Sequence, residues 1–312
     1  RTILWVIFGF SMVLLWDKWQ LHNGNKATFF PSPAAVGAAA PAAGASAPLA
    51  GAASVPASTA PAVASIGASA VPGTPAPAAP AAREKIEVTT DVYRLTFDGE
   101  GGSLTHAELL KHADMTDKAK NFVLFDESTQ RVYAAQTGLI GGSFPTHKTV
   151  MTAVPGPRAL KDGENELTIR FESPEQGGVK LVKTWTLKRG AYDIAVKHEV
   201  VNVGSTAVSP QLYLQLVRDG NKPPGESSFY STFTGPAVYT DAKKYQKIEF
   251  KDIENGKVDI PKESPNGYVA MVQHYFASAW LLADGVQREL FTRKVSDNLY
   301  SVGMITPLGN ID

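Results

Sequence analysis

Six histidines are the side chains best suited to chemistry near neutral pH, because an imidazole can act as general acid, general base or metal ligand. None has a partner at the spacing that metal sites use on a recognisable helix or strand. His198 falls on the apolar face of an expected strand, which favours a hydrogen-bonded core or interface histidine. A metal shared by His106 and His112, the closest pair in the folded region, is the remaining alternative. The histidines are His22, His106, His112, His147, His198 and His274.

Other reactive groups are equally uninformative. The absence of cysteine excludes disulfides, thiolate metal sites and a cysteine nucleophile. The chain has no nucleophile elbow, P-loop, H-E-x-x-H or dinucleotide-binding glycine motif. The glycines at 99–102 and 141–142 lie between strand-like runs and predict turns rather than phosphate-binding loops. We therefore predict no catalytic residue, no cofactor, no metal and no small-molecule substrate.

Charge gives weak guidance about partners. The formal net charge is zero, which argues against a nucleic-acid-binding protein, because such domains usually carry a basic excess. A local cluster of Lys243, Lys244, Lys247 and Lys251 predicts a solvated surface. Contact with anionic lipid or with a partner is the alternative for this cluster.

The elements that would position these side chains are strands. From Arg83 onward, apolar and polar residues alternate, as in 93–97, 104–110, 167–171 and 212–216. The clearest pair is 179–187 followed by 192–201, with a turn containing Gly190 between them. Residues 242–253 fit either a helical turn or an irregular strand. The pattern predicts an all-β domain, a large antiparallel β-sandwich.

The most apolar folded segment runs from Asn266 to Trp280 and contains three aromatic residues close together, Tyr275, Phe276 and Trp280. We interpret it as two strands buried on both faces.

A second apolar run lies at the N-terminus, from Ile3 to Trp16, and contains no charge. Its length is ambiguous for a bilayer span, but the flanking tryptophans and Lys18 favour a membrane interface. A buried core helix and a cleavable signal peptide are the alternatives; small-residue cleavage sites lie far beyond the run. We favour an uncleaved anchor, whose orientation the flanking charges do not determine. The anchoring residues would be Ile3, Leu4, Trp5, Val6, Ile7, Phe8, Leu14, Leu15 and Trp16.

Between these regions, Pro31 to Ala82 consists mainly of alanine and proline, with no charged residue. Recurring prolines disfavour helix, and too few bulky apolar residues are present to form a core. We predict three parts: a transmembrane signal anchor at 1–21, a disordered linker at 22–83, and a β-domain at 84–312 that is incomplete at its C-terminus.

Two sets of residues carry a family resemblance. The segment with Asn266, Gly267, Tyr275, Phe276, Ser278 and Trp280 resembles the periplasmic domain of the YidC-type membrane protein insertases. The opening residues 1–5, with 14–17, 23–24 and 29–31, resemble the first transmembrane helix of that family and its exit. The resemblance implies a galactose-mutarotase-like β-supersandwich, in which these six motif residues are structural.

The resemblance also implies a function. It places the chain in the bacterial inner membrane, multi-pass in the full-length protein, with the β-domain in the periplasm. The implied role is to assist insertion, folding and assembly of inner-membrane proteins, with or without the Sec translocon. The partners would be inner-membrane lipid, Sec translocon components and nascent membrane proteins, and the protein would not be an enzyme. The alternative is a membrane-tethered carbohydrate-binding or mutarotase-like domain; a peptide-binding cleft that chaperones emerging segments is a third hypothesis.

Overall fold

The computed structural model describes residues 83–223, 225 and 232–312. The predicted anchor, with all nine of its named residues, and the predicted linker up to residue 82 lie outside the described residues. Within the described part, no helix combines the length and the apolar character that a membrane crossing requires.

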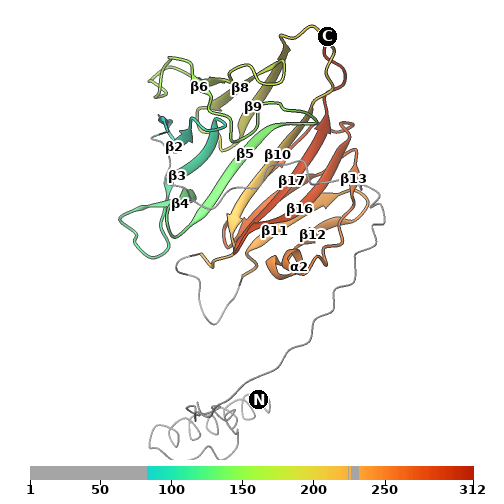
Figure 1. Ribbon diagram of the computed structural model, residues 1–312. Coiled ribbons are helices and arrows are strands. Elements are labelled where there is room, and N and C mark those ends of the chain that lie inside the picture. Colours follow the sequence, from blue (N-terminus) through green and yellow to red (C-terminus); the bar gives the residue numbers. More distant parts are fainter. Residues whose placement is uncertain (1–82, 224, 226–231) are drawn as a thin grey trace, which may run out of the picture. The chain divides into compact units, whose positions relative to one another are not determined.

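The described residues form three antiparallel sheets and one short helix, which confirms the predicted all-β antiparallel class (Figure 1). The largest sheet has the order β1-β2-β3-β4-β5-β10-β17-β16-β13. Its strands are β1 (Lys85–Thr89), β2 (Tyr93–Asp98), β3 (Ser103–Ala113), β4 (Asn121–Glu127), β5 (Val132–Ile140), β10 (Gln211–Asp219), β17 (Leu299–Pro307), β16 (Arg288–Ser296) and β13 (Glu263–Ser264).

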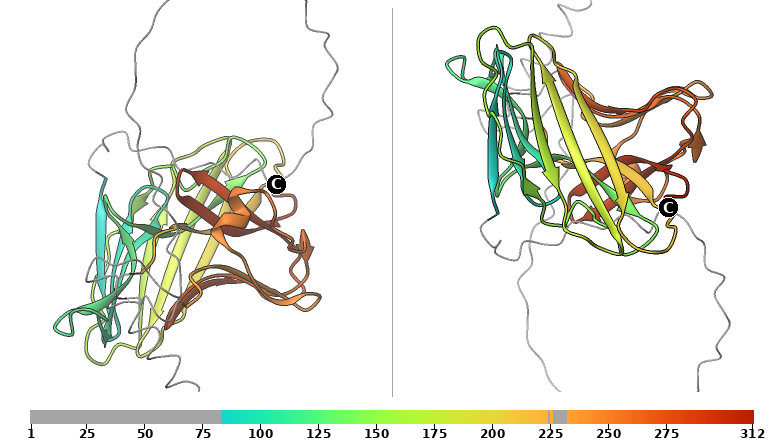
Figure 2. Two further views of the ribbon diagram at one scale, coloured as in Figure 1. Left: turned by 90° about the horizontal axis from the view of Figure 1, so that it is seen from below. Right: turned by 90° about the horizontal axis from the view of Figure 1, so that it is seen from above.

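Two four-stranded sheets accompany the large one. One has the order β12-β11-β14-β15, with β12 (Lys244–Lys247), β11 (Gly235–Thr240), β14 (Tyr268–Gln273) and β15 (Phe276–Leu281). The other has the order β6-β7-β8-β9, with β6 (Thr152–Ala153), β7 (Glu166–Glu172), β8 (Val179–Lys188) and β9 (Ile194–Asn202). Figure 2 shows the orange strands of the β12-to-β15 sheet as a layer separate from the cyan, green and yellow strands of the large sheet.

The predicted hairpin is present as β8 and β9. Gly190 adopts a positive φ of 72° in the turn, a conformation that glycine reaches without steric cost. The strands pair antiparallel without a register shift, with Trp185 opposite Val196. The predicted turn at 99–102 joins β2 to β3, and Gly101 and Gly102 both have positive φ.

One apolar core joins the three sheets. Side chains of the large sheet, such as Phe97 on β2 and Leu214 on β10, belong to the same buried cluster as Trp185 on β8 and Trp280 on β15. Because strand side chains alternate between faces, Tyr213 on β10 points the other way, into a small second cluster with Phe291. Strand β10 is therefore buried on both faces along most of its length.

The ambiguous segment 242–253 contains both of its predicted forms. It holds the short edge strand β12 and the helix α2 (Phe250–Glu254), which is a little more than one turn long.

Candidate functional site

A cleft of about 870 Å³ lies between the edge strands of the two smaller sheets. Strand β9 forms one wall and strand β15 the other, and side chains of the large sheet, including Leu104, Ala135 and Leu214, contribute to the lining. Most lining residues are apolar. The cleft is the candidate functional site, because concave and largely apolar surfaces are where proteins bind ligands.

The β9 wall carries His198, the histidine that the sequence places on an apolar face. Its Nε2 lies 2.8 Å from Thr137 Oγ1 on β5, so the predicted hydrogen-bonded histidine is confirmed. Burial and the neighbouring Lys183 lower the pKa of His198 to about 3. The imidazole is therefore neutral at neutral pH.

Lys183 on β8 lies behind this wall and is fully buried. Its Nζ donates hydrogen bonds of 2.6 Å to the carbonyl oxygens of Gly101 and Thr137. Burial lowers the pKa of Lys183 to about 7. A neutral amine has two N–H donors, which these two carbonyls satisfy, whereas an ammonium has a third. Lys183 thus ties the β6-to-β9 sheet to the large sheet.

The β15 wall is attached through two of the motif residues. Ser278 Oγ lies 2.5 Å from the Tyr133 hydroxyl on β5, and Trp280 Nε1 donates a 3.0 Å hydrogen bond to the carbonyl of Gln215 on β10. The residues that alternate with them along the strand, Ala277 and Ala279, are exposed. One face of β15 is therefore hydrogen-bonded to the large sheet, and the side chains of the other face are exposed.

Aromatic rings connect the two walls. Phe276 stacks on Phe122 of β4 with ring centroids 4.0 Å apart. The His112 ring meets Phe276 edge-on at 5.5 Å and also contacts Tyr192, which precedes β9, at 5.6 Å. Tyr192 in turn packs against Tyr93 at 5.3 Å, and both tyrosines line the cleft. His112 therefore belongs to an aromatic cluster.

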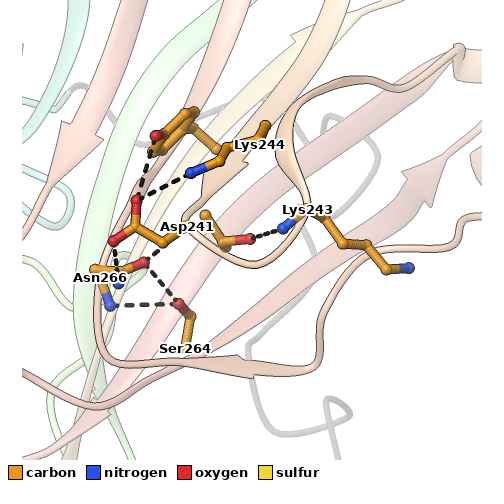
Figure 3. Close-up of polar contacts among 7 residues, drawn as sticks. Asp241, Lys243, Lys244, Ser264 and Asn266 are labelled. Atoms are coloured by element: carbon orange, nitrogen blue, oxygen red, sulfur yellow. Dashed lines mark hydrogen bonds and ion pairs between the residues drawn. The ribbon is translucent and has the colours of Figure 1, made fainter.

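Asn266 and Gly267 belong to the turn before β14, outside the cleft lining, and Figure 3 shows the polar contacts of Asn266 there. Asn266 donates from its side-chain amide to Asp241 at 2.7 Å and accepts at 3.0 Å from the backbone N–H of Asp241. Gly267 has a φ of 92°, and a Cβ there would collide with the carbonyl of Tyr239. Tyr275 lies in the turn between β14 and β15 and is 75% exposed.

The segment 266–280 differs from its prediction in one respect. Strand β14 is largely buried, as expected, but β15 is half exposed, with Leu281 at its end 68% accessible. The interpretation of both strands as buried on both faces is therefore wrong for β15. The reason is topological, because β15 is the last strand of its sheet and borders the cleft instead of a neighbouring strand.

The lysine cluster is partly neutralised. Lys243 pairs with Asp259 at 2.6 Å, and Lys244 lies 3.8 Å from Asp241, the carboxylate that also holds Asn266. All four lysines of the cluster are exposed, which supports the prediction of a solvated surface.

Few groups in the described part of the chain suit metal or acid–base chemistry. No group of three or more potential ligands among these residues is placed to hold a metal. His106 faces Asp126 at 3.6 Å, while His112 belongs to the aromatic cluster. Among the residues that line the cleft, His198 and Asp193 have the side chains that most resemble a general acid and a general base.

Sequence reasoning missed three buried cations of the described part of the chain, Lys183, Arg218 and Arg288. Lys183 stands in register with Leu181, Trp185 and Leu187, so the alternation of β8 placed it on the buried face. Arg288 at the start of β16 is 1% exposed and donates to the backbone carbonyls of Gly267, Pro265 and Ala283, among others. No local pattern marks Arg288, because its acceptors come from loops.

The sheets and the apolar cleft define a large antiparallel β-domain suited to binding. Residues 85–312 match the family model described as YidC periplasmic domain. The chain belongs to this family.

Curated relatives extend the match to the whole chain. It is 47% identical over 313 residues to "Membrane protein insertase YidC" of Janthinobacterium sp. (strain Marseille), covering 100% of this chain and 54% of that relative. It is 48% identical over 311 residues to the protein of the same name from Cupriavidus necator, with the same coverage. The chain thus spans about half the length of the curated relatives it matches.

Solved structures show a more distant likeness. A galactose mutarotase related enzyme from Lactobacillus acidophilus aligns with a TM-score of 0.44 and 9% identity, covering 73% of this chain and 87% of that one. A putative aldose 1-epimerase from Escherichia coli aligns with a TM-score of 0.37 and 8% identity, covering 72% and 88%.

Proposed function

We propose that this chain is the N-terminal part of a membrane protein insertase and chaperone that assists insertion, folding and assembly of inner-membrane proteins. The observation that supports this most strongly is the 47% identity, along the entire chain, to relatives named membrane protein insertase. In this proposal the β-domain stands in the periplasm of a bacterium, and the full-length protein is multi-pass in the inner membrane. Nascent membrane proteins, inner-membrane lipid and components of the Sec translocon are its partners.

Within that protein, the β-domain has a binding task and no catalytic one. The apolar cleft supports this assignment, because its lining offers a neutral, hydrogen-bonded imidazole and few charged groups. The six motif residues have structural roles in the proposal. Phe276, Ser278 and Trp280 hold the β14–β15 hairpin against the large sheet. Asn266 and Gly267 shape the turn before the hairpin, and Tyr275 forms part of the turn within it.

Complementation tests this function. Cells depleted of their own insertase would receive either the full-length gene or a gene from which residues 22–312 are deleted, and insertion of a reporter membrane protein would be measured. We expect the full-length gene to restore insertion and the deletion to retain most of it. Failure of the full-length gene to restore insertion would contradict the insertase function. Complete loss with the deletion, in a protein that still assembles in the membrane, would contradict the accessory role of the β-domain.

A further inference from the structure

The sheet edges in the described part of the chain differ in how they are protected. Edge strands present unpaired N–H and C=O groups, and proteins guard them with charges, prolines, bulges or very short length. Charged residues occupy β1, β9, β12 and β13, and β6 is two residues long. Strand β15 has the sequence FASAWL, without a charge or a proline, and pairs with β14 without a register shift.

This unguarded edge borders the cleft. Ala277, Ala279 and Leu281 of β15 line it and are exposed. The opposite wall, β9, carries Lys197 and Glu199, which form a 3.0 Å ion pair. The two walls of one cleft thus differ: β9 is guarded against strand addition and β15 is not.

We propose that β15 is a docking edge for one extended, uncharged polypeptide segment, which adds as a further strand to the β12-β11-β14-β15 sheet inside the cleft. Backbone hydrogen bonds would give affinity, as in other cases of strand addition, and alternate side chains of the segment would meet the apolar lining. The inference rests on the proposed function for the source of the segment, an apolar stretch of a membrane protein that has not yet reached its final position.

The surroundings of the edge favour a single strand over a second copy of this chain. Because β9 lies across the same cleft, a folded sheet that paired its edge with β15 would collide with β9, whereas one extended segment occupies only the spacing of a strand, about 4.8 Å.

The charges of the cleft favour an uncharged occupant. The ionic groups that line the cleft, Asp193 and Lys197, both belong to the β9 side, and a charged segment at β15 would lose hydration without a counterion.

A pair of matched variants tests the edge. Ala279→Lys places a charge on β15, and Ala195→Lys makes the same change on β9, at an alanine that is also exposed and also lines the cleft. The probe is a short capped peptide of alternating valine and threonine, labelled with fluorescein, and binding to the 312-residue chain in detergent is measured by anisotropy. We expect A279K to weaken binding by about tenfold or more and A195K by less than about twofold.

Two further measurements separate strand addition from simple apolar binding. The same peptide with every backbone nitrogen methylated keeps its side chains but can donate no backbone hydrogen bond along either edge, and we expect it not to bind. Hydrogen exchange should slow in residues 276–281 when the unmodified peptide is present, and not in 194–202. Equal binding of the methylated peptide, equal loss in both variants, or no binding of the unmodified peptide would overturn the proposal.

Other occupants would also be revealed. Dimerisation that A279K abolishes would identify a second copy as the partner and overturn the proposal. In the full-length protein, protection of 276–281 without any peptide would identify a later segment of the same chain as the occupant and would also overturn the proposal.

Far-ultraviolet circular dichroism of both variants is the control that they fold. Peptide binding and reporter insertion are separate measurements, so a chain that binds no peptide while the full-length gene restores insertion contradicts only the strand proposal.

Discussion

At the residue scale, the most unusual group is Lys183, a fully buried amine whose partners among the described residues are two carbonyl oxygens and no carboxylate. In the part of the chain that the structure describes, Lys183 therefore forms no ion pair. The amine instead acts as a hydrogen-bonding link between sheets.

The lowered pKa of Lys183 makes stability depend on pH. Burial brings this pKa from 10.5 to about 7 in the folded state. Between these values the unfolded chain binds more protons at this site than the folded chain, so stability rises with pH across that window and is lowest below about pH 7. We expect the free energy of unfolding in urea to rise by a few kcal/mol between pH 7 and pH 10 from this group.

The variant Lys183→Met should lose that part of the pH dependence, while Lys180→Met, an exposed lysine on the same strand, should retain it. Lys183→Met should also be less stable at pH 10, by about 2–5 kcal/mol, because two buried carbonyls lose their donor. Equal pH slopes for the wild-type chain and Lys183→Met would show that the amine remains charged in the fold.

At the scale of elements, the turn before β14 depends on close backbone approach. Gly267 and Gly285 both have positive φ, 92° and 84°, so alanine is strained at either position. Around Gly285 a Cβ would meet nothing within 4 Å, whereas at Gly267 it would collide with the carbonyl of Tyr239 on β11.

This difference predicts unequal effects of one substitution. Gly285→Ala should cost about 1 kcal/mol in the free energy of unfolding, from backbone strain alone. Gly267→Ala should cost roughly 2 kcal/mol more, because the turn and the edge of β11 must move apart. Urea denaturation of the two variants gives the comparison, and equal losses would show that the turn can relax around the added methyl.

The strands that the sequence predicted well are those with regular alternation of large apolar residues. Leu167, Ile169 and Phe171 on β7 and the β8–β9 pair are examples, because a buried face and a solvated face leave a period of two in the sequence. Strand β15 was predicted poorly because alanine is compatible with either environment. Its half-exposure follows from its being the last strand of a sheet, which is a property of pairing order.

At the scale of the whole molecule, the cleft could not be predicted from the sequence, because it too depends on the order in which the strands pair. Its walls, β9 and β15, are separated by more than seventy residues in the chain, and the lining from the large sheet comes from several further strands. Local patterns identified His198 as a hydrogen-bonded histidine, but its partner Thr137 becomes a neighbour only when β5 and β9 meet in the fold. The family motif indicated the correct segment without indicating which of its faces is exposed.

The shared core predicts how the β-domain unfolds. One buried cluster contains side chains from all three sheets, and Trp185 of one small sheet lies 6.2 Å from Trp280 of the other, measured between ring centroids. Lys183, Ser278 and Trp280 add hydrogen bonds from the small sheets to the large one. No small sheet can therefore separate without exposing part of the common core, and unfolding should be cooperative.

We expect a single transition in urea, with coincident midpoints for far-ultraviolet circular dichroism, which reports the sheets, and near-ultraviolet circular dichroism, which reports aromatic packing. Weakening one junction should shift this transition without splitting it: Trp280→Phe, which removes the hydrogen bond to Gln215, should lower the midpoint for both signals together. Two resolved transitions, of which Trp280→Phe shifts only one, would instead show that the β12-to-β15 sheet unfolds separately. Since β15 forms one wall of the cleft, the cleft would then open before the domain unfolds.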